Sequence, residues 1–270
     1  HDYSTALTDL HLDAVVYDTD EMIEVIAAAL SQNKVVGWFQ GRMEFGPRAL
    51  GARSILANPC DPKMKEVINS KVKYRESFRP FAPVVTAEDL SVYFDVPAGM
   101  ELPFMVQVVD VREEYRNTLP AITHEDGTAR VQSITKRSNH LLHTLLTEFQ
   151  KHSGVPVLLN TSFNVRGEPI ACTPSDAIHT FFNSDIDILV LGNHIVMRDG
   201  IIQNADSSCD GYNDAGSLSE PDIKTKVLDF YQQLPFNVFS NAVDYAARLQ
   251  SNPIKQYPKL HKFLSKQKNT

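Results

Sequence analysis

The chain has 270 residues, of which 43% are hydrophobic and 22% are charged, and its formal net charge at pH 7 is −7. This length and apolar content suffice for one sizeable core with an appendage. The acidic balance argues against a general nucleic-acid-binding surface. No apolar run approaches the ~20 residues that span a bilayer, so no membrane association is expected.

The predicted elements alternate between helix and strand. Asp18 is expected to cap a helix that runs to about Gln32, because its side chain can accept from the first free amide groups. The elements predicted after it are a strand at 34–40, a helix at 61–72, a strand at 104–111, a helix at 138–152, a strand at 155–159, a helix capped near Thr173 and a strand at 186–191. This order predicts an α/β (α+β) fold, a twisted mixed sheet flanked by helices.

The composition of the chain changes after residue 198. Residues 199–222 are acidic, small and turn-rich, which predicts a linker between a domain at 1–198 and a helical C-terminal appendage at 223–270. The lysine-rich tail resembles segments that lead into class I methyltransferase domains, which predicts a truncated downstream domain. A helix that packs back on the main domain is the alternative. The first residue is His1 rather than Met, so we expect an expressed fragment.

Cysteine usage predicts the compartment of the protein. Cys60, Cys172 and Cys209 are odd in number and widely separated. This pattern favours reduced thiols over a disulfide framework or a zinc knuckle. The N-terminal residues also lack the charged region and apolar core of a signal peptide. We therefore expect a cytoplasmic protein.

The segment GRMEFGPRALG, residues 41–51, is a glycine-punctuated loop with two arginines. Its glycines permit backbone conformations in which amide groups converge on an anion. Arg42 and Arg48 present planar guanidinium groups that suit phosphate or carboxylate oxygens. The loop matches neither the Walker pattern nor the dinucleotide fingerprint. A surface turn with solvated arginines is the alternative.

This loop belongs to a basic island in an acidic chain. Residues 34–79 contain ten Lys/Arg and four Asp/Glu. Such a local reversal of sign favours a focused anion site. The densest part is KYRESFRPFAP at 73–83, where two prolines and interleaved aromatic residues predict an ordered loop or strand edge that carries Lys73, Arg75 and Arg79.

Two further polar stretches complete the predicted site. HEDGTARVQ, residues 124–132, turns at Asp126-Gly127 and then alternates as a strand would, which places Arg130 and Gln132 on one face. The apolar run 155–159 ends in NTSFN, whose Asn160, Ser162 and Asn164 follow a buried strand. Polar residues at the carboxyl end of a buried strand are where open α/β sheets usually place ligand groups. A turn that closes the strand is the alternative reading.

Four long motifs in this order, GRMEFGPRALGARSILANP, NSKVKYRESFRPFAPVV, HEDGTARVQSI and GVPVLLNTSFNVRGEPI, closely resemble the C-terminal domain of NodU/TobZ-type O-carbamoyltransferases. The resemblance covers roughly residues 20–198 and implies a YrdC/Sua5-like fold. It further implies that ATP and carbamoyl phosphate bind and form carbamoyl-adenylate with release of pyrophosphate. A separate N-terminal, Kae1-like domain, which lies outside this sequence, would then pass the carbamoyl group to a hydroxyl acceptor.

The resemblance also implies roles for individual residues. Lys73, Arg79 and Arg130 are the predicted catalytic residues, the first two holding phosphate or carbamoyl oxygens. The predicted ATP- and carbamoyl-phosphate-binding residues are Arg42, Arg48, Arg75, His124, Gln132, Asn160, Ser162 and Asn164. Mg²⁺ is expected to accompany ATP and to bind the phosphates, because no Asp/Glu pair stands out as its ligand. His140 and His143 lie three apart on one predicted helix, but without a third ligand they are interpreted as surface histidines.

Two other functions fit parts of the sequence. A threonylcarbamoyl-adenylate synthase would use similar chemistry with bicarbonate and threonine, but it would lack the long glycine- and arginine-rich motif at 41–54. A non-catalytic YrdC-like module that binds nucleic acid is the second alternative. The net acidity and the absence of aromatic stacking platforms count against it.

Overall fold

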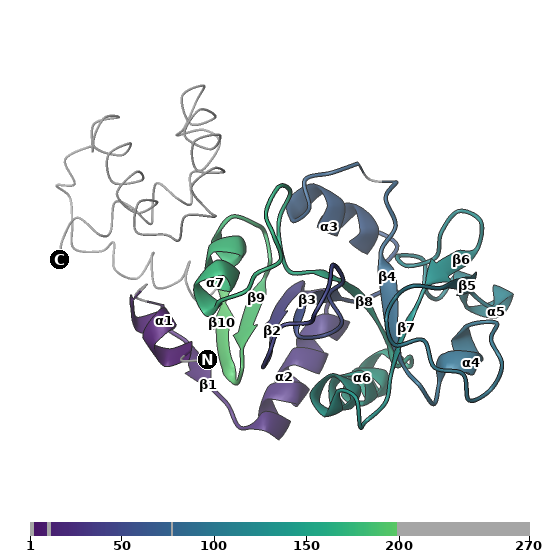
Figure 1. Ribbon diagram of the computed structural model, residues 1–270, viewed down its shortest axis with the longest axis horizontal. Coiled ribbons are helices and arrows are strands. Elements are labelled where there is room, and N and C mark those ends of the chain that lie inside the picture. Colours follow the sequence, from purple (N-terminus) through teal and green to yellow (C-terminus); the bar gives the residue numbers. More distant parts are fainter. Residues whose placement is uncertain (1–2, 10–11, 77, 199–270) are drawn as a thin grey trace. The chain divides into compact units, whose positions relative to one another are not determined.

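A computed structural model describes residues 3–9, 12–76 and 78–198 (Figure 1). The predicted linker at 199–222, the predicted tail at 223–270 and Cys209 lie outside the described residues. Within the described part, no helix has both the length and the apolar character needed to cross a bilayer.

Helices and short strands are interspersed along the described chain. In order they are α1 (Tyr3–Asp9), β1 (Val15–Val16), α2 (Thr19–Ser31), β2 (Val36–Phe39), β3 (Arg53–Ala57), α3 (Met64–Lys71), β4 (Ala82–Thr86), α4 (Leu90–Tyr93), β5 (Val108–Asp110), α5 (Glu113–Arg116), β6 (Thr128–Arg130), β7 (Gln132–Ile134), α6 (His140–Ser153), β8 (Val157–Ser162), α7 (Pro174–Phe182), β9 (Ile188–Leu191) and β10 (His194–Met197).

The strands form a large mixed sheet and a small hairpin-like sheet. The large sheet has the order β1-β10-β9-β2-β3-β8-β4-β7, and β5 pairs with β6 in the small one. The pairs β2–β9 and β4–β7 are parallel, whereas the other pairs are antiparallel. This mixed sheet with flanking helices confirms the predicted α/β fold.

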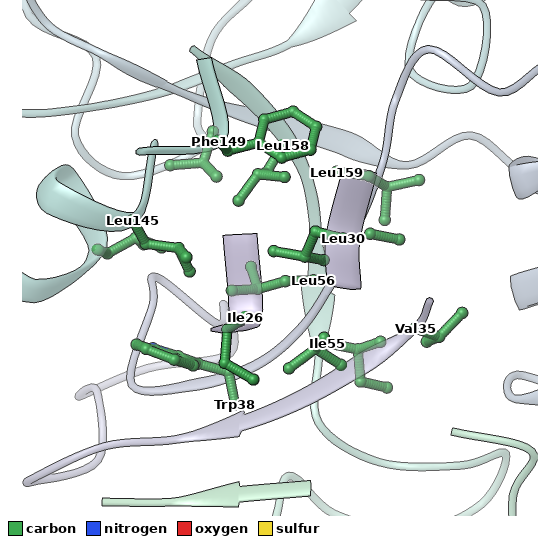
Figure 2. Packing of buried hydrophobic residues seen from close by; sticks show 14 of the residues in the cluster. Ile26, Leu30, Val35, Trp38, Ile55, Leu56, Leu145, Phe149, Leu158 and Leu159 are labelled. Atoms are coloured by element: carbon green, nitrogen blue, oxygen red, sulfur yellow. The ribbon is translucent and has the colours of Figure 1, made fainter. Parts of the chain in front are cut away.

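Helices pack on both faces of the large sheet. Trp38 and Phe39 are adjacent in β2 and therefore point to opposite faces. Trp38 lies with Ile26 of α2 and Leu145 of α6 in the hydrophobic core (Figure 2). Phe39 instead makes an edge contact with Tyr3 of α1, with ring centroids 6.1 Å apart. Helices α2 and α6 thus lie side by side on one face, while α1 and α7 lie on the other (Figure 1).

Three helices begin where a polar side chain caps them. Asp18 accepts from the amide of Glu21 at the start of α2, as the sequence predicts. Thr173 forms a capping box with Asp176 at the start of α7, also as predicted. Asn139 caps α6. Each cap satisfies an amide group that has no partner inside its helix.

The predicted strand at 104–111 is largely wrong. Only Val108–Asp110 forms a strand, in the small sheet. Phe104 and Val106 are exposed, at 62% and 75%. The apolar run predicts a strand, but no described strand pairs with this segment before residue 108. Helix α3 begins at Met64, three residues later than the predicted start at Asp61.

The predicted continuous strand through Arg130 and Gln132 is also wrong. Arg130 ends β6 in the small sheet, and Gln132 begins β7 in the large sheet. Period-two alternation cannot reveal that a chain changes sheets between two residues. Strand β8 extends further than predicted, because it continues through Asn160 and Ser162 and does not end at Leu159. These polar residues are therefore held by pairing with β3 and β4.

Candidate functional site

A pocket of about 120 Å³ lies where the loop at 41–51, the segment after α3, β6 and β8 meet. Its basic residues are Arg48, Arg75 and Arg130, and its polar residues are Asn160, Thr161 and Ser162. No Asp or Glu is among the described residues that line it. Three guanidinium groups without a lining carboxylate suit an anion with several oxygens.

The loop at 41–51 is organised around the carboxylate of Glu44. Its Oε1 accepts from the amides of Leu50, Ala52 and Arg53, at 2.7, 2.7 and 3.2 Å. The buried Arg53 guanidinium donates to the carbonyls of Gln40 and Gly41 at 2.9 and 3.0 Å. These contacts close the loop onto the start of β3 and hold Arg48 over the pocket. Sequence reasoning missed Glu44, although an acid inside an arginine-rich loop is a signal for such an internal acceptor.

Lys73 lies beside the pocket in a cluster of oxygens. Its Nζ donates to the carbonyl and hydroxyl oxygens of Ser162 at 2.6 and 3.2 Å. It also donates to the carbonyl oxygen and Oδ1 of Asn164, both at 2.9 Å. The Ser162 hydroxyl in turn donates to Asn164 Oδ1 at 2.6 Å. Three residues predicted from two separate motifs are thereby joined in one network.

The surroundings of Lys73 lower the pKa of its amine to about 7. Burial is the main cause, because the side chain is 6% exposed. The nearby positive charge of Arg75 lowers the pKa further, and Glu168 partly opposes it. An anion bound in the pocket would favour the ammonium form.

Arg75 is held in place by a buried asparagine. Its Nε donates to Asn69 Oδ1 at 2.7 Å, and its guanidinium stacks over the Phe81 ring at 4.7 Å. Asn69 Nδ2 also donates to the carbonyl of Arg79 at 3.1 Å. Burial and then the charge of Arg79 lower the pKa of Arg75. Asn69 was not predicted, yet a polar residue on the buried side of a short helix is the signal that would have found it.

Arg130 and Arg48 both line the pocket and are close enough for their charges to interact. Burial, and next the like charge of Arg48, lowers the pKa of Arg130. His124 is half-buried and its Nδ1 lies 3.1 Å from the Thr128 hydroxyl. Burial is the largest cause that lowers the pKa of His124, and Arg130 contributes to this shift. The two arginines are therefore poised to share an anionic ligand.

Asn160 and Gln132 form a buried amide pair beneath the loop. Asn160 Nδ2 donates to Gln132 Oε1 at 2.8 Å and to the carbonyl of Ala49 at 3.3 Å. Gln132 Nε2 donates to the carbonyl of Leu50 at 2.9 Å. The pair ties β7 and β8 to the loop that carries Arg48.

The structure gathers most of the predicted site residues in one place. Arg48, Arg75, Arg130, Asn160 and Ser162 line the pocket, while Lys73, Asn164 and Gln132 bind to lining residues. The remaining three predicted residues, Arg42, Arg79 and His124, are not part of the lining either. Arg42 and Arg79 are exposed on the flanking segments.

The described residues contain no group of three or more His, Cys, Asp or Glu side chains that could hold a metal ion. His143 Nε2 lies 3.2 Å from Glu88 Oε2, and His140 is exposed at the start of α6. Cys60 is half-buried and Cys172 is exposed, and both are free thiols.

Residues 27–198 match the family described as carbamoyltransferase C-terminus. The chain belongs to this family. The nodulation protein NolO of Bradyrhizobium diazoefficiens is 48% identical over 189 residues, which are 70% of this chain and 34% of that protein. The 3'-hydroxymethylcephem-O-carbamoyltransferase of Streptomyces clavuligerus is 41% identical over 168 residues, 62% of this chain and 31% of that protein. This carbamoyltransferase C-terminal domain spans about one third of the length of these relatives.

Two solved structures show partial similarity to the carbamoyltransferase C-terminal domain. Full-length HypF in its phosphate- and nucleotide-bound form aligns with a TM-score of 0.45 and 18% identity, over 65% of this chain and 25% of that one. Sua5 of P. abyssi complexed with L-threonine aligns with a TM-score of 0.45 and 15% identity, over 63% of this chain and 46% of that one.

Proposed function

We propose that this domain binds ATP and carbamoyl phosphate and forms carbamoyl-adenylate, which serves transfer of the carbamoyl group to a hydroxyl acceptor. The observation that carries the proposal is the position of the Lys73–Ser162–Asn164 cluster beside a pocket lined by three arginines. Membership of the carbamoyltransferase family supports the choice of carbamoyl chemistry.

The reaction brings together groups that repel each other. Water converts carbamoyl phosphate to carbamate and inorganic phosphate. A carbamate oxygen then attacks the α-phosphorus of ATP, the bond from that phosphorus to the bridging β-phosphate oxygen breaks, and pyrophosphate leaves. Both reactants are anions, so fixed positive charge and orientation are the main contributions a protein can make.

The residues in and beside the pocket would supply this positive charge and orientation in different ways. Arg48 and Arg130 would bind phosphate oxygens with their planar guanidinium groups. Ser162 presents a hydroxyl whose position is fixed by Lys73 and Asn164. The ammonium form of Lys73 would add positive charge beside the α-phosphate. Mg²⁺ would arrive with ATP as part of the substrate, because the pocket lining offers it no carboxylate.

The acceptor step is proposed to take place outside this sequence. The chain spans about one third of its carbamoyltransferase relatives, which leaves room in the whole protein for an N-terminal, Kae1-like domain that binds the acceptor. The cytoplasm, where ATP and carbamoyl phosphate are available, is the proposed location.

Pyrophosphate release from Mg-ATP tests the proposal. Release should depend on carbamoyl phosphate and should fall to background in Lys73→Ala. A folded chain that binds ATP without releasing pyrophosphate would place completion of the site in the rest of the protein. A folded chain that binds neither ATP nor carbamoyl phosphate would refute the proposed function.

A further inference from the structure

Asn160 carries an acceptor atom that no residue in the described part of the chain uses. The residue is 1% exposed and lines the pocket. Its Oδ1 is buried and has no hydrogen-bond partner among the described residues. A buried polar atom without a partner is destabilising, so its retention at a ligand pocket needs an explanation.

The orientation of the Asn160 amide follows from its neighbours. The carbonyl of Leu50 can only accept, so the group of Gln132 that faces it is Nε2. The Gln132 atom that faces Asn160 is then Oε1, which can also only accept. The carbonyl of Ala49 can also only accept, so it too must face a donor of Asn160. Asn160 must therefore direct Nδ2 to these partners, and Oδ1 is the atom that remains for a ligand.

We propose that Oδ1 of Asn160 accepts a hydrogen bond from the amino group of the carbamoyl substrate, and that this contact makes the site select carbamoyl phosphate over acyl phosphates that lack an N–H. The inference rests on the proposed function and adds a specificity-determining residue to it. The amino group is retained in carbamoyl phosphate, carbamate and carbamoyl-adenylate, so one acceptor serves all three species.

The other polar groups of the pocket are suited to the opposite end of the substrate. Arg48, Arg75 and Arg130 are donors only and match phosphate oxygens. The Ser162 hydroxyl already donates to Asn164 and accepts from Lys73. A ligand that carries both phosphate oxygens and an amino group is complementary to a lining that contains these donors together with the Asn160 acceptor.

A comparison of two ligands tests the selectivity directly. Acetyl phosphate has a methyl group where carbamoyl phosphate has its amine. The two ligands are titrated calorimetrically into the full chain in the presence of magnesium and a non-hydrolysable ATP analogue. Carbamoyl phosphate should bind at least roughly tenfold more tightly than acetyl phosphate. In Asn160→Leu, which keeps the side-chain size, the two dissociation constants should become similar.

Asn58→Leu is the matched control. Asn58 is also a buried amide, 8% exposed, but it pairs with Asn33 and Cys60 and does not line the pocket. This variant should keep the preference for carbamoyl phosphate. Retention of the preference in folded Asn160→Leu would overturn the inference.

A measurement on the unmodified protein decides the matter if Asn160→Leu does not fold. The ¹⁵N resonance of the Asn160 side chain should shift on addition of carbamoyl phosphate and much less on addition of acetyl phosphate. A shift caused by the ATP analogue alone would assign the acceptor to the nucleotide and overturn the inference. Equal affinity for both phosphates would overturn the selectivity but leave adenylate formation intact, whereas binding of neither would refute the proposed function as well.

Discussion

Lys73 Nζ donates to Oδ1 of Asn164 at 2.9 Å, although the two residues are 91 positions apart in the chain. The contact joins the segment after α3 to the end of β8. It also places a buried amine next to the pocket that Arg48, Arg75 and Arg130 line. This hydrogen bond brings two distant sequence motifs together in one site.

Replacement of Lys73 should remove the proposed activity. Lys73→Met keeps the length of the side chain but loses its charge and its hydrogen bonds, so kcat/KM for pyrophosphate release should fall by roughly 10²- to 10³-fold. Lys71→Met is the matched control, because Lys71 is exposed at the end of α3. Thermal unfolding of both variants checks that they fold. Similar kinetics for the two folded variants would contradict a catalytic role for Lys73.

The activity should fall as pH rises through about 7. The pKa of Lys73 is lowered to about 7, so its amine is charged below this pH and neutral above it. Only the charged form offsets the negative charge of the reacting phosphates. The kcat/KM profile of the free enzyme should therefore decline with a midpoint near this value, and Lys73→Arg should flatten the decline because guanidinium stays protonated. A decline that persists unchanged in an active Lys73→Arg variant would assign the titration to another group.

The arginines of the pocket should matter for ligand affinity. Arg48→Ala or Arg130→Ala removes a guanidinium that faces the bound anion, so the affinity for carbamoyl phosphate or ATP should fall roughly 10- to 100-fold. Arg137→Ala removes an exposed arginine that does not line the pocket and serves as the control for net charge. Calorimetric titration measures the affinities. Equal losses in all three variants would indicate a general charge effect instead of a built site.

Two glycines in the same loop should differ in their tolerance to substitution. Both have positive φ, +51° at Gly41 and +107° at Gly51. A Cβ at Gly51 would lie 2.5 Å from Leu142 Cδ2 and 2.9 Å from Asn139 Nδ2, whereas a Cβ at Gly41 meets nothing within 4 Å. Gly51→Ala should lower the free energy of unfolding by about 1–3 kcal/mol more than Gly41→Ala does. Denaturant titration of both variants measures the difference.

Local patterns predicted the parts of the fold that depend on neighbours in sequence. The caps at Asp18 and Thr173 and the apolar face of the helix at 138–152 were found because capping and amphipathic periodicity act within a few residues. In this helix Leu142, Leu145, Leu146 and Phe149 are buried, and Leu141 is half-buried. The prediction of a strand at 104–111 was largely wrong, because strand formation depends on a partner strand that lies elsewhere in the chain.

The amino-acid sequence alone shows that this protein concentrates arginine and lysine residues in a few glycine- and proline-punctuated segments of an acidic chain, and it predicts an anion site there. Composition, local charge and motif order suffice for that conclusion. Which of these residues come into contact depends on the three-dimensional fold. It separated Arg130 and Gln132 into two sheets, placed Asn160 in the pocket lining with an acceptor atom that no described residue uses, and left Arg42 and Arg79 outside the lining. The reason is that such contacts depend on strand order and register, which are set by long-range packing.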